Sequence, residues 1–283
     1  MVSLTFPRRD EGVAVLVRLD RCIGCRACQV ACKEWNSLEY RPTEFSPTFT
    51  TPQDLEPNVW KVVFFGEITR EYPTGFADPY VQPIPFNCVH CQTAPCARAC
   101  PVGAIKVSDE GAVVIEGREC IGCGYCLEAC PYNVPRQRED GTYTKCTFCV
   151  DRIQHGMEPA CVAVCPTEVF EFGPASQVLA SAEAERAAGK EVYGLNLDSY
   201  VGGSIRWVYS ISKDKAHALK IRLPEKATVP FNFLREVLNP VIRYGAVLGA
   251  ALLAVIGVIH EVKYRKERVK ALKEATKEKG GKE

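Results

Sequence analysis

The stretch CIGCRACQVACKEWN, residues 22–36, places four cysteines within eleven positions, with gaps of two, two and three residues. A C-x2-C-x2-C loop can wrap three corners of one [4Fe–4S] cube, and a cysteine three residues further on then points to a neighbouring cube. The spacing therefore predicts a fold organised around pairs of iron–sulfur clusters.

All 16 cysteines of this 283-residue chain fall into four groups of this kind, which we name quartets one to four. The last three quartets end in Cys-Pro, whereas Lys33 follows the first. The quartets are Cys22, Cys25, Cys28 and Cys32; Cys88, Cys91, Cys96 and Cys100; Cys120, Cys123, Cys126 and Cys130; and Cys146, Cys149, Cys161 and Cys165.

Zinc and disulfides are the alternatives to clusters. A structural zinc site is closed by two separated ligand pairs and does not require a third cysteine two residues later. A chain of 283 residues can bury a core without disulfides, and disulfide-rich secreted scaffolds are normally much shorter. The sequence therefore predicts four [4Fe–4S] clusters.

Composition narrows the classes of function. The formal net charge is +1, which argues against a nucleic-acid-binding face. All cysteines are committed to quartets, and the chain has no phosphate-binding G-x-G-x-x-G or Walker-type loop. We therefore expect no catalytic site, and an electron relay is favoured over a self-contained enzyme or a structural metal-binding adaptor.

Several residues beside the quartets carry secondary predictions. Gly24 and Gly122 lie between ligands, where glycine lets the backbone turn its N–H groups toward cluster sulfur. His90 is expected to donate to cluster sulfur rather than to bind metal. The basic residues near ligands are expected mainly to be solvated, although they have the charge to raise cluster potentials; they are Arg98, Lys145 and Arg152.

The start of the chain predicts a strand over Val13–Leu19 that leads to Cys22. The apolar run is too short for the core of a Sec-type signal peptide. Arg8-Arg9 is expected to be a surface pair, with a twin-arginine signal as the alternative.

The quartets resemble those of the four-cluster electron-transfer subunits of molybdopterin oxidoreductases. CIGCRACQVACKEWN, CIGCGYCLEACPYNVPR (residues 120–136) and KCTFCVDRIQHGMEPACVAVCPT (residues 145–167) are most similar to the beta subunits of membrane-bound respiratory formate dehydrogenases. The likeness runs from about Val13 to Phe172 and resumes at VGGSIRWVYS and the C-terminal apolar segment. Glu34-Trp35-Asn36 is its most family-specific part.

The resemblance implies that quartet one exchanges ligands with quartet four, and quartet two with quartet three. The implied ligand sets are Cys22, Cys25, Cys28 and Cys165 for cluster A; Cys32, Cys146, Cys149 and Cys161 for cluster B; Cys88, Cys91, Cys96 and Cys130 for cluster C; and Cys100, Cys120, Cys123 and Cys126 for cluster D. It also implies a catalytic alpha subunit with a molybdenum or tungsten bis-pterin, a membrane cytochrome b gamma subunit, and a higher oligomer of the complex.

The expected fold class is α+β, with two intertwined ferredoxin-like halves and one C-terminal transmembrane helix. Residues 1–87 and 141–195 are expected to form one half and residues 88–140 the other. A strand around Ser204–Ser210 and a linker would occupy residues 196–238, and a surface helix would follow quartet four at residues 176–192. The stretch from Ser37 to Phe86 is a long insertion of no assigned role beyond packing and subunit contact, with a strand-like piece at Trp60–Phe65.

The transmembrane helix is expected over residues 239–262, because residues 244–259 carry no charge and Asn239-Pro240 suits a helix start. A buried core helix is the alternative. Gly245 and Gly249 form a GxxxG pair that suits close approach of a partner helix. His260 is expected to lie at the membrane interface rather than to bind haem.

Residues 260–283 hold nine Lys or Arg and five Glu, so the tail at residues 263–283 is expected in the cytoplasm and the cluster domain on the extracytoplasmic side of the cytoplasmic membrane. The chain would then be exported folded, attached to a partner with a signal. The predicted function is an electron relay of a formate dehydrogenase, with a hydrogenase, polysulfide reductase or nitrate reductase relay as the alternative.

Overall fold

The computed structural model describes residues 6–40, 42, 44, 45, 47–71, 77–195 and 204–224, and residues 245, 249, 253–258, 260, 261 and 264 of the C-terminal segment. The chain divides into two compact units, Met1–Val229 and Pro230–Glu283. The first unit contains all four quartets.

A four-stranded mixed sheet with the order β8-β1-β10-β9 forms the base of the first unit. β1 pairs in parallel with β10 and antiparallel with β8, and β9 pairs antiparallel with β10. The strands are β1 (Val13–Arg18), β8 (Phe170–Pro174), β9 (Glu191–Tyr193) and β10 (Trp207–Ile211). The strand expected at Val13–Leu19 is confirmed, and the one expected around Ser204–Ser210 lies at Trp207–Ile211.

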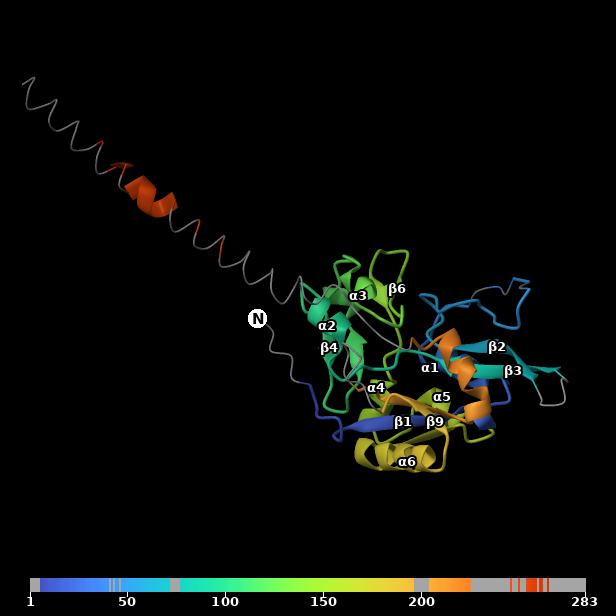
Figure 1. The fold of residues 1–283 in the computed structure, drawn as a ribbon. Helices are drawn as coiled ribbons and strands as arrows, with labels where there is room; N and C mark the ends of the chain where they lie inside the picture. The colour runs from blue at the N-terminus through green and yellow to red at the C-terminus, as the bar shows by residue number, and fades with distance from the viewer. Residues whose placement is uncertain are drawn as a thin grey trace, which may run out of the picture. The chain divides into compact units, whose positions relative to one another are not determined.

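Helix α6 (Ala175–Ala187) covers one face of this sheet, as Figure 1 shows below β1 and β9. Ala14 and Leu16 of β1 pack against Val178 of α6 on that face. Val15 of β1 faces the opposite way, into the main core. Both faces of β1 are therefore buried, which explains why its sequence is continuously apolar rather than alternating with polar residues.

An ion-pair network fixes α6 to the sheet. The Glu185 carboxylate on α6 accepts hydrogen bonds from Arg18 Nε at 2.8 Å and from Ser210 Oγ at 3.1 Å, and it pairs with Lys190 Nζ at 2.6 Å. Burial alone would raise the pKa of Glu185, but the hydrogen bonds from Lys190, Arg18 and Ser210 lower it to about 2.

We expect Glu185→Gln to lower the free energy of unfolding by about 1–3 kcal/mol at neutral pH, because it removes the negative charge that Arg18 and Lys190 share. A carboxylate with a lowered folded-state pKa stabilises the protein above its unfolded pKa of about 4.3, and this contribution is lost as the pH falls toward 2. Chemical denaturation of both iron-loaded proteins at pH 7 measures the difference. Equal stability of the two proteins would contradict the assignment.

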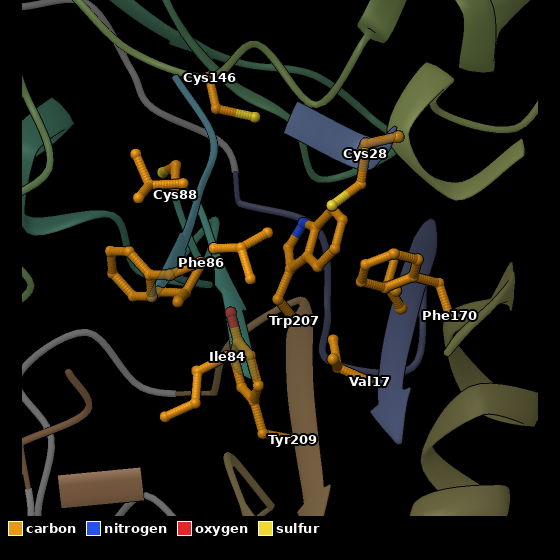
Figure 2. Packing of buried hydrophobic residues seen from close by; sticks show 14 of the residues in the cluster. Val17, Cys28, Ile84, Phe86, Cys88, Cys146, Phe170, Trp207 and Tyr209 are labelled. Atoms are coloured by element: carbon orange, nitrogen blue, oxygen red, sulfur yellow. The ribbon is translucent and has the colours of Figure 1, made fainter. Parts of the chain in front are cut away.

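The long insertion forms a hairpin that packs on the same core. β2 (Val62–Glu71) pairs antiparallel with β3 (Ala77–Phe86). Val62, Ile84 and Phe86 are fully buried, and Figure 2 shows Ile84 and Phe86 beside Tyr209 of β10. The insertion is thus part of the core. The sequence predicted that it would pack on the protein but did not predict the hairpin.

Short helices and two small hairpins carry the quartets. Figure 1 shows α2, β4, α3 and β6 gathered on one side of the unit, and β1, β9 and α6 on the other. The elements are η1 (Leu19–Arg21), α1 (Ala27–Trp35), α2 (Pro95–Ala99), β4 (Ile105–Val107), β5 (Val113–Ile115), η2 (Gly117–Glu119), α3 (Tyr125–Glu128), β6 (Arg136–Gln137), β7 (Tyr143–Thr144), α4 (Val150–Gln154), α5 (Ala160–Ala163) and η3 (Lys213–Ile221).

The mixed α+β class is confirmed by this element order. The domain boundaries stay predictions. β10 comes from residues 196–238, which were expected to be a strand and linker, and it joins the sheet of the first predicted half. The expected surface helix at residues 176–192 begins at Ala175 and ends at Ala187.

The predicted membrane helix at residues 239–262 lies mostly outside the described residues. Its described positions, including Gly245 and Gly249, are helical. Within the described part of the chain, no helix has both the length and the apolar content needed to span a bilayer. The predicted tail at residues 263–283 lies outside the described residues except for Tyr264.

Candidate metal centres

Four cavities of the first unit are each lined by four cysteines, and we name them cavities A to D. The cysteines are Cys22, Cys25, Cys28 and Cys165 in cavity A; Cys32, Cys146, Cys149 and Cys161 in cavity B; Cys88, Cys91, Cys96 and Cys130 in cavity C; and Cys100, Cys120, Cys123 and Cys126 in cavity D. The fold thus brings together the same sets that the family resemblance implies.

Short helices explain how one quartet serves two cavities. Cys28 and Cys32 lie one turn apart on α1, and Cys28 lines cavity A while Cys32 lines cavity B. Cys126 lies on α3, and Cys130 follows four residues later to line cavity C rather than cavity D. A helical turn separates the two thiols enough that they face different cavities.

A left-handed residue precedes the second cysteine of every quartet. The φ angles are +69° at Gly24, +47° at His90, +71° at Gly122 and +63° at Phe148. This conformation turns the local backbone around the first cysteine, and Phe148 N donates to Cys146 Sγ at 3.4 Å. The predicted glycine turns at residues 24 and 122 are therefore confirmed, while His90 and Phe148 adopt the same conformation and stack on each other, with ring centroids 4.7 Å apart.

We expect Gly122→Ala to be more damaging than Gly24→Ala, although both place an L-residue in the left-handed region at a cost of about 1–2 kcal/mol. A Cβ at residue 122 would lie 2.5 Å from the backbone oxygen of Gly141, whereas one at residue 24 would meet the movable ring of Phe65 at 2.7 Å. Thermal melts of the metal-loaded variants, with iron content, measure this order. Equal losses would contradict it.

A second turn follows three of the quartets and directs an amide back to the last cysteine. Ala104 N donates to Cys100 Sγ at 3.3 Å, and the same bond of 3.4 Å joins Val134 N to Cys130 Sγ and Val169 N to Cys165 Sγ. N–H donors of this kind favour the thiolate form and tune bound clusters.

Quartet one lacks the proline turn, and the side chain of Asn36 supplies the donor instead. Its Nδ2 lies 2.8 Å from Cys32 O and 3.8 Å from Cys32 Sγ. Trp35 Nε1 donates to Asp151 at 2.8 Å, and Arg152 lies 4.2 Å from the centroid of the Trp35 ring. The Glu34-Trp35-Asn36 sequence therefore joins quartet one to the loop of quartet four. Arg152 also packs on this tryptophan rather than being merely solvated.

Two buried lysines lie among the thiols. Lys61 lines cavity B and Lys145 lines cavity C. Burial alone would lower both pKa values, but thiolates raise them: chiefly Cys161 and Cys28 for Lys61, and Cys88 and Cys96 for Lys145. Sequence reasoning missed Lys61 as a site residue; its one signal is a lone charge within the apolar run Val59–Phe65.

The thiols themselves are poor acids in this fold. Burial raises the pKa of Cys28 to about 12, and that of Cys130 and Cys149 to about 11. They become thiolates when a bound cation compensates the charge, so metal loading releases protons.

The donor set fits iron–sulfur clusters. All four cavities offer only sulfur as anionic ligand, which suits soft metals and iron–sulfur groups. Trp207 lines cavity B, and its buried Nε1 has no hydrogen-bond partner among the described residues, so a sulfur acceptor in that cavity would satisfy it. Figure 2 shows the Trp207 ring beside Phe170, with Cys28 above it. In the described part of the chain, no three potential ligands converge as they would on one metal ion.

His90 is neutral and buried. Its Nδ1 accepts the N–H of Val113 at 3.0 Å, and Nε2 has no partner among the described residues. Burial, followed by Lys145 and Arg206, lowers its pKa well below the usual range. This tautomer has an N–H available at Nε2, and the donation to cluster sulfur stays a prediction.

The chain is similar to known iron–sulfur proteins over most of its length. Two family models described as 4Fe-4S dicluster domains match residues 21–104 and 80–175. The nitrate-inducible formate dehydrogenase iron–sulfur subunit of Escherichia coli is 39% identical over 198 residues, which cover 68% of this chain and 66% of that relative, just under two thirds of its length.

For two further relatives, the match covers a larger share of the relative's own length. The formate dehydrogenase-O iron–sulfur subunit of Escherichia coli is 35% identical over 260 residues, covering 88% of this chain and 84% of that protein. The thiosulfate reductase electron transfer subunit of Salmonella typhi is 38% identical over 176 residues, covering 61% of this chain and 80% of its own. The chain accordingly belongs to the family of the formate dehydrogenase iron–sulfur subunits.

Proposed function

We propose that the chain relays electrons through four [4Fe–4S] clusters, one in each of cavities A to D, between a catalytic subunit and a membrane partner. The observation that carries the proposal is the set of four cavities, each lined by four cysteines drawn from two quartets. When bound, such clusters accept and release single electrons. The four thiols of each cavity would be the ligands of clusters A to D.

The contacts between cavities support the order A, B, C, D. Cys28 and Cys32 connect cavities A and B through one turn of α1. Asn87 connects B to C, because its Nδ2 lies 4.0 Å from Cys146 Sγ and donates to Cys88 O at 2.8 Å. Cys126 and Cys130 connect C to D. Cavities B and C are therefore interior steps of the relay.

The ends of this series are the parts open to partners. Cys25 of cavity A and Cys123 of cavity D are the exposed cysteines. Ile23 and Ile121, beside them, are 65% and 63% exposed, and apolar side chains at such positions suit contact with another subunit. Electrons would enter at one end and leave at the other.

The partners follow from the relatives. We propose a formate dehydrogenase catalytic subunit with a molybdenum or tungsten bis-pterin at one end, and a membrane cytochrome b subunit at the other, within a higher oligomer. The support is the similarity to formate dehydrogenase iron–sulfur subunits over most of the chain. Nucleic acid is not expected as a partner.

We propose attachment to the cytoplasmic membrane through residues 239–262, with the cluster domain outside and the basic tail inside. The support is the uncharged stretch 244–259, with the basic residues beyond it. Gly245 and Gly249 would pack against a partner helix, since a Cβ at either position meets no described atom within 4 Å. A reporter fused after Glu283 that is active only outside the cell would contradict this orientation.

Iron and zinc analysis of the anaerobically purified, gently solubilised complex tests the relay. We expect about sixteen iron atoms per chain, four for each cluster, and a pterin-containing subunit identified by mass spectrometry. Zinc in place of iron, or no iron and no partner, would contradict the proposal.

The second candidate is the equivalent relay of a hydrogenase or of a polysulfide, nitrate or thiosulfate reductase. It is favoured by the similarity to a thiosulfate reductase electron transfer subunit. If the first candidate is correct, formate added to the anaerobic complex should reduce the clusters as fast as the enzyme turns over. Clusters that respond to hydrogen or to a sulfur or nitrogen oxyanion, and not to formate, would favour the second.

A further inference from the structure

Lys61 is the most deeply buried charge in the described part of the chain. It comes just before β2, is 1% exposed, and its Nζ donates to Asn87 Oδ1 at 2.7 Å. The same Nζ lies 4.4 Å from the ring centroid of Trp207 and 4.7 Å from that of Phe170.

These contacts do not neutralise the ammonium. Among the described residues, Lys61 has no carboxylate partner. One amide oxygen and two aromatic faces compensate only part of the cost of removing an ammonium from water. The groups near Lys61 that become anionic when metal is bound are cysteines of two cavities: Cys28 from cavity A, and Cys161, Cys146 and Cys32 from cavity B.

The surroundings of the other cavities differ in the positive charge that they hold. Lys145 is 4% exposed and occupies a corresponding position between cavities B and C, with Cys88, Cys96 and Cys146 as its anionic neighbours. Its Nζ donates to Val113 O and to Cys146 O, the latter at 3.0 Å. No lysine or arginine is found among the described side chains that line cavity D.

We propose that Lys61 is a buried counter-charge that raises the reduction potentials of the clusters in cavities A and B together. This inference rests on the proposed relay function. A cluster held by four thiolates is anionic, and reduction adds one more negative charge, so a nearby fixed cation stabilises the reduced form. Because Lys61 acts on both cavities, it would favour reduction of the first two clusters of the relay together.

The test is a redox titration monitored by EPR on the full complex, comparing wild type with Lys61→Met. We expect two of the four midpoint potentials to fall and that of cluster D to stay unchanged. Lys61→Arg, which keeps the charge, should retain all four potentials near their wild-type values. Lys213→Met removes one positive charge from an exposed position and serves as the matched control, with no change expected.

Unchanged potentials in a fully iron-loaded Lys61→Met protein would overturn the inference. If Lys61→Met loses iron, Lys61→Gln and Lys61→Arg decide the matter through iron content alone. Loading of the arginine variant but of neither neutral variant supports a counter-charge, and loss from all three shows that side-chain shape matters instead. A wild-type complex without iron would refute the relay itself, which separates that failure from this one.

Discussion

Replacing Cys165 with alanine is expected to remove one cluster, that of cavity A, and to leave those of cavities C and D intact. Cavity A takes its fourth cysteine from quartet four, and three thiols leave one corner of a cube without its ligand. We expect the loss of about four of about sixteen iron atoms and of one EPR component in the reduced protein.

Cys161→Ala is the matched control, because Cys161 lies four residues earlier in the same quartet and lines cavity B. The two variants should lose different EPR components. If each quartet bound its own cube instead, both variants would lose the same component, and the ligand sets of clusters A and B would be wrong.

Removal of iron is expected to leave the protein without a cooperatively folded core at 25 °C, so that it shows no cooperative unfolding transition. Without the clusters, Lys61 and Lys145 are buried ammoniums with no counter-charge, and each such uncompensated charge costs about 3–5 kcal/mol. Two of them together approach the whole stability of an ordinary domain, about 5–15 kcal/mol. Binding of the clusters is thus part of folding.

Near-ultraviolet circular dichroism during heating, before and after anaerobic chelation, measures this effect. The double variant Lys61→Met/Lys145→Met provides the control, since its iron-free form should be more stable than the iron-free wild type. An iron-free wild-type protein that melts like the loaded one would show that the clusters do not support the core.

Local patterns in the sequence predicted much of this structure. The strand before Cys22, the helix after quartet four and the glycine turns each depend on residues close together in the chain. The cysteine spacings predicted that quartets would share clusters. The particular pairing came from family resemblance, and the assignment of each cysteine as a cluster ligand stays a prediction.

Features that depend on distant residues were not predictable in this way. Lys61 gains its meaning from Cys161 and Trp207, which only the folded chain brings near it. The left-handed turns at His90 and Phe148 lack the glycine that marks such a turn, and their mutual stacking helps hold them. The amide of Asn36 acts as a donor because quartet one lacks the proline turn.

The parallel pairing of β1 with β10 has a consequence for biosynthesis. Val15 pairs with Trp207, so a ribosome must add about 190 residues before the strand finds its neighbour, which takes roughly 10–40 s at about 5–20 residues per second. During that interval β1 presents an apolar, unpaired edge, and the cysteine-lined cavities of the first half lack walls that are still unmade. Trp207 of β10 is part of the lining of cavity B, so that cavity is complete only after translation has passed the sheet's last strand.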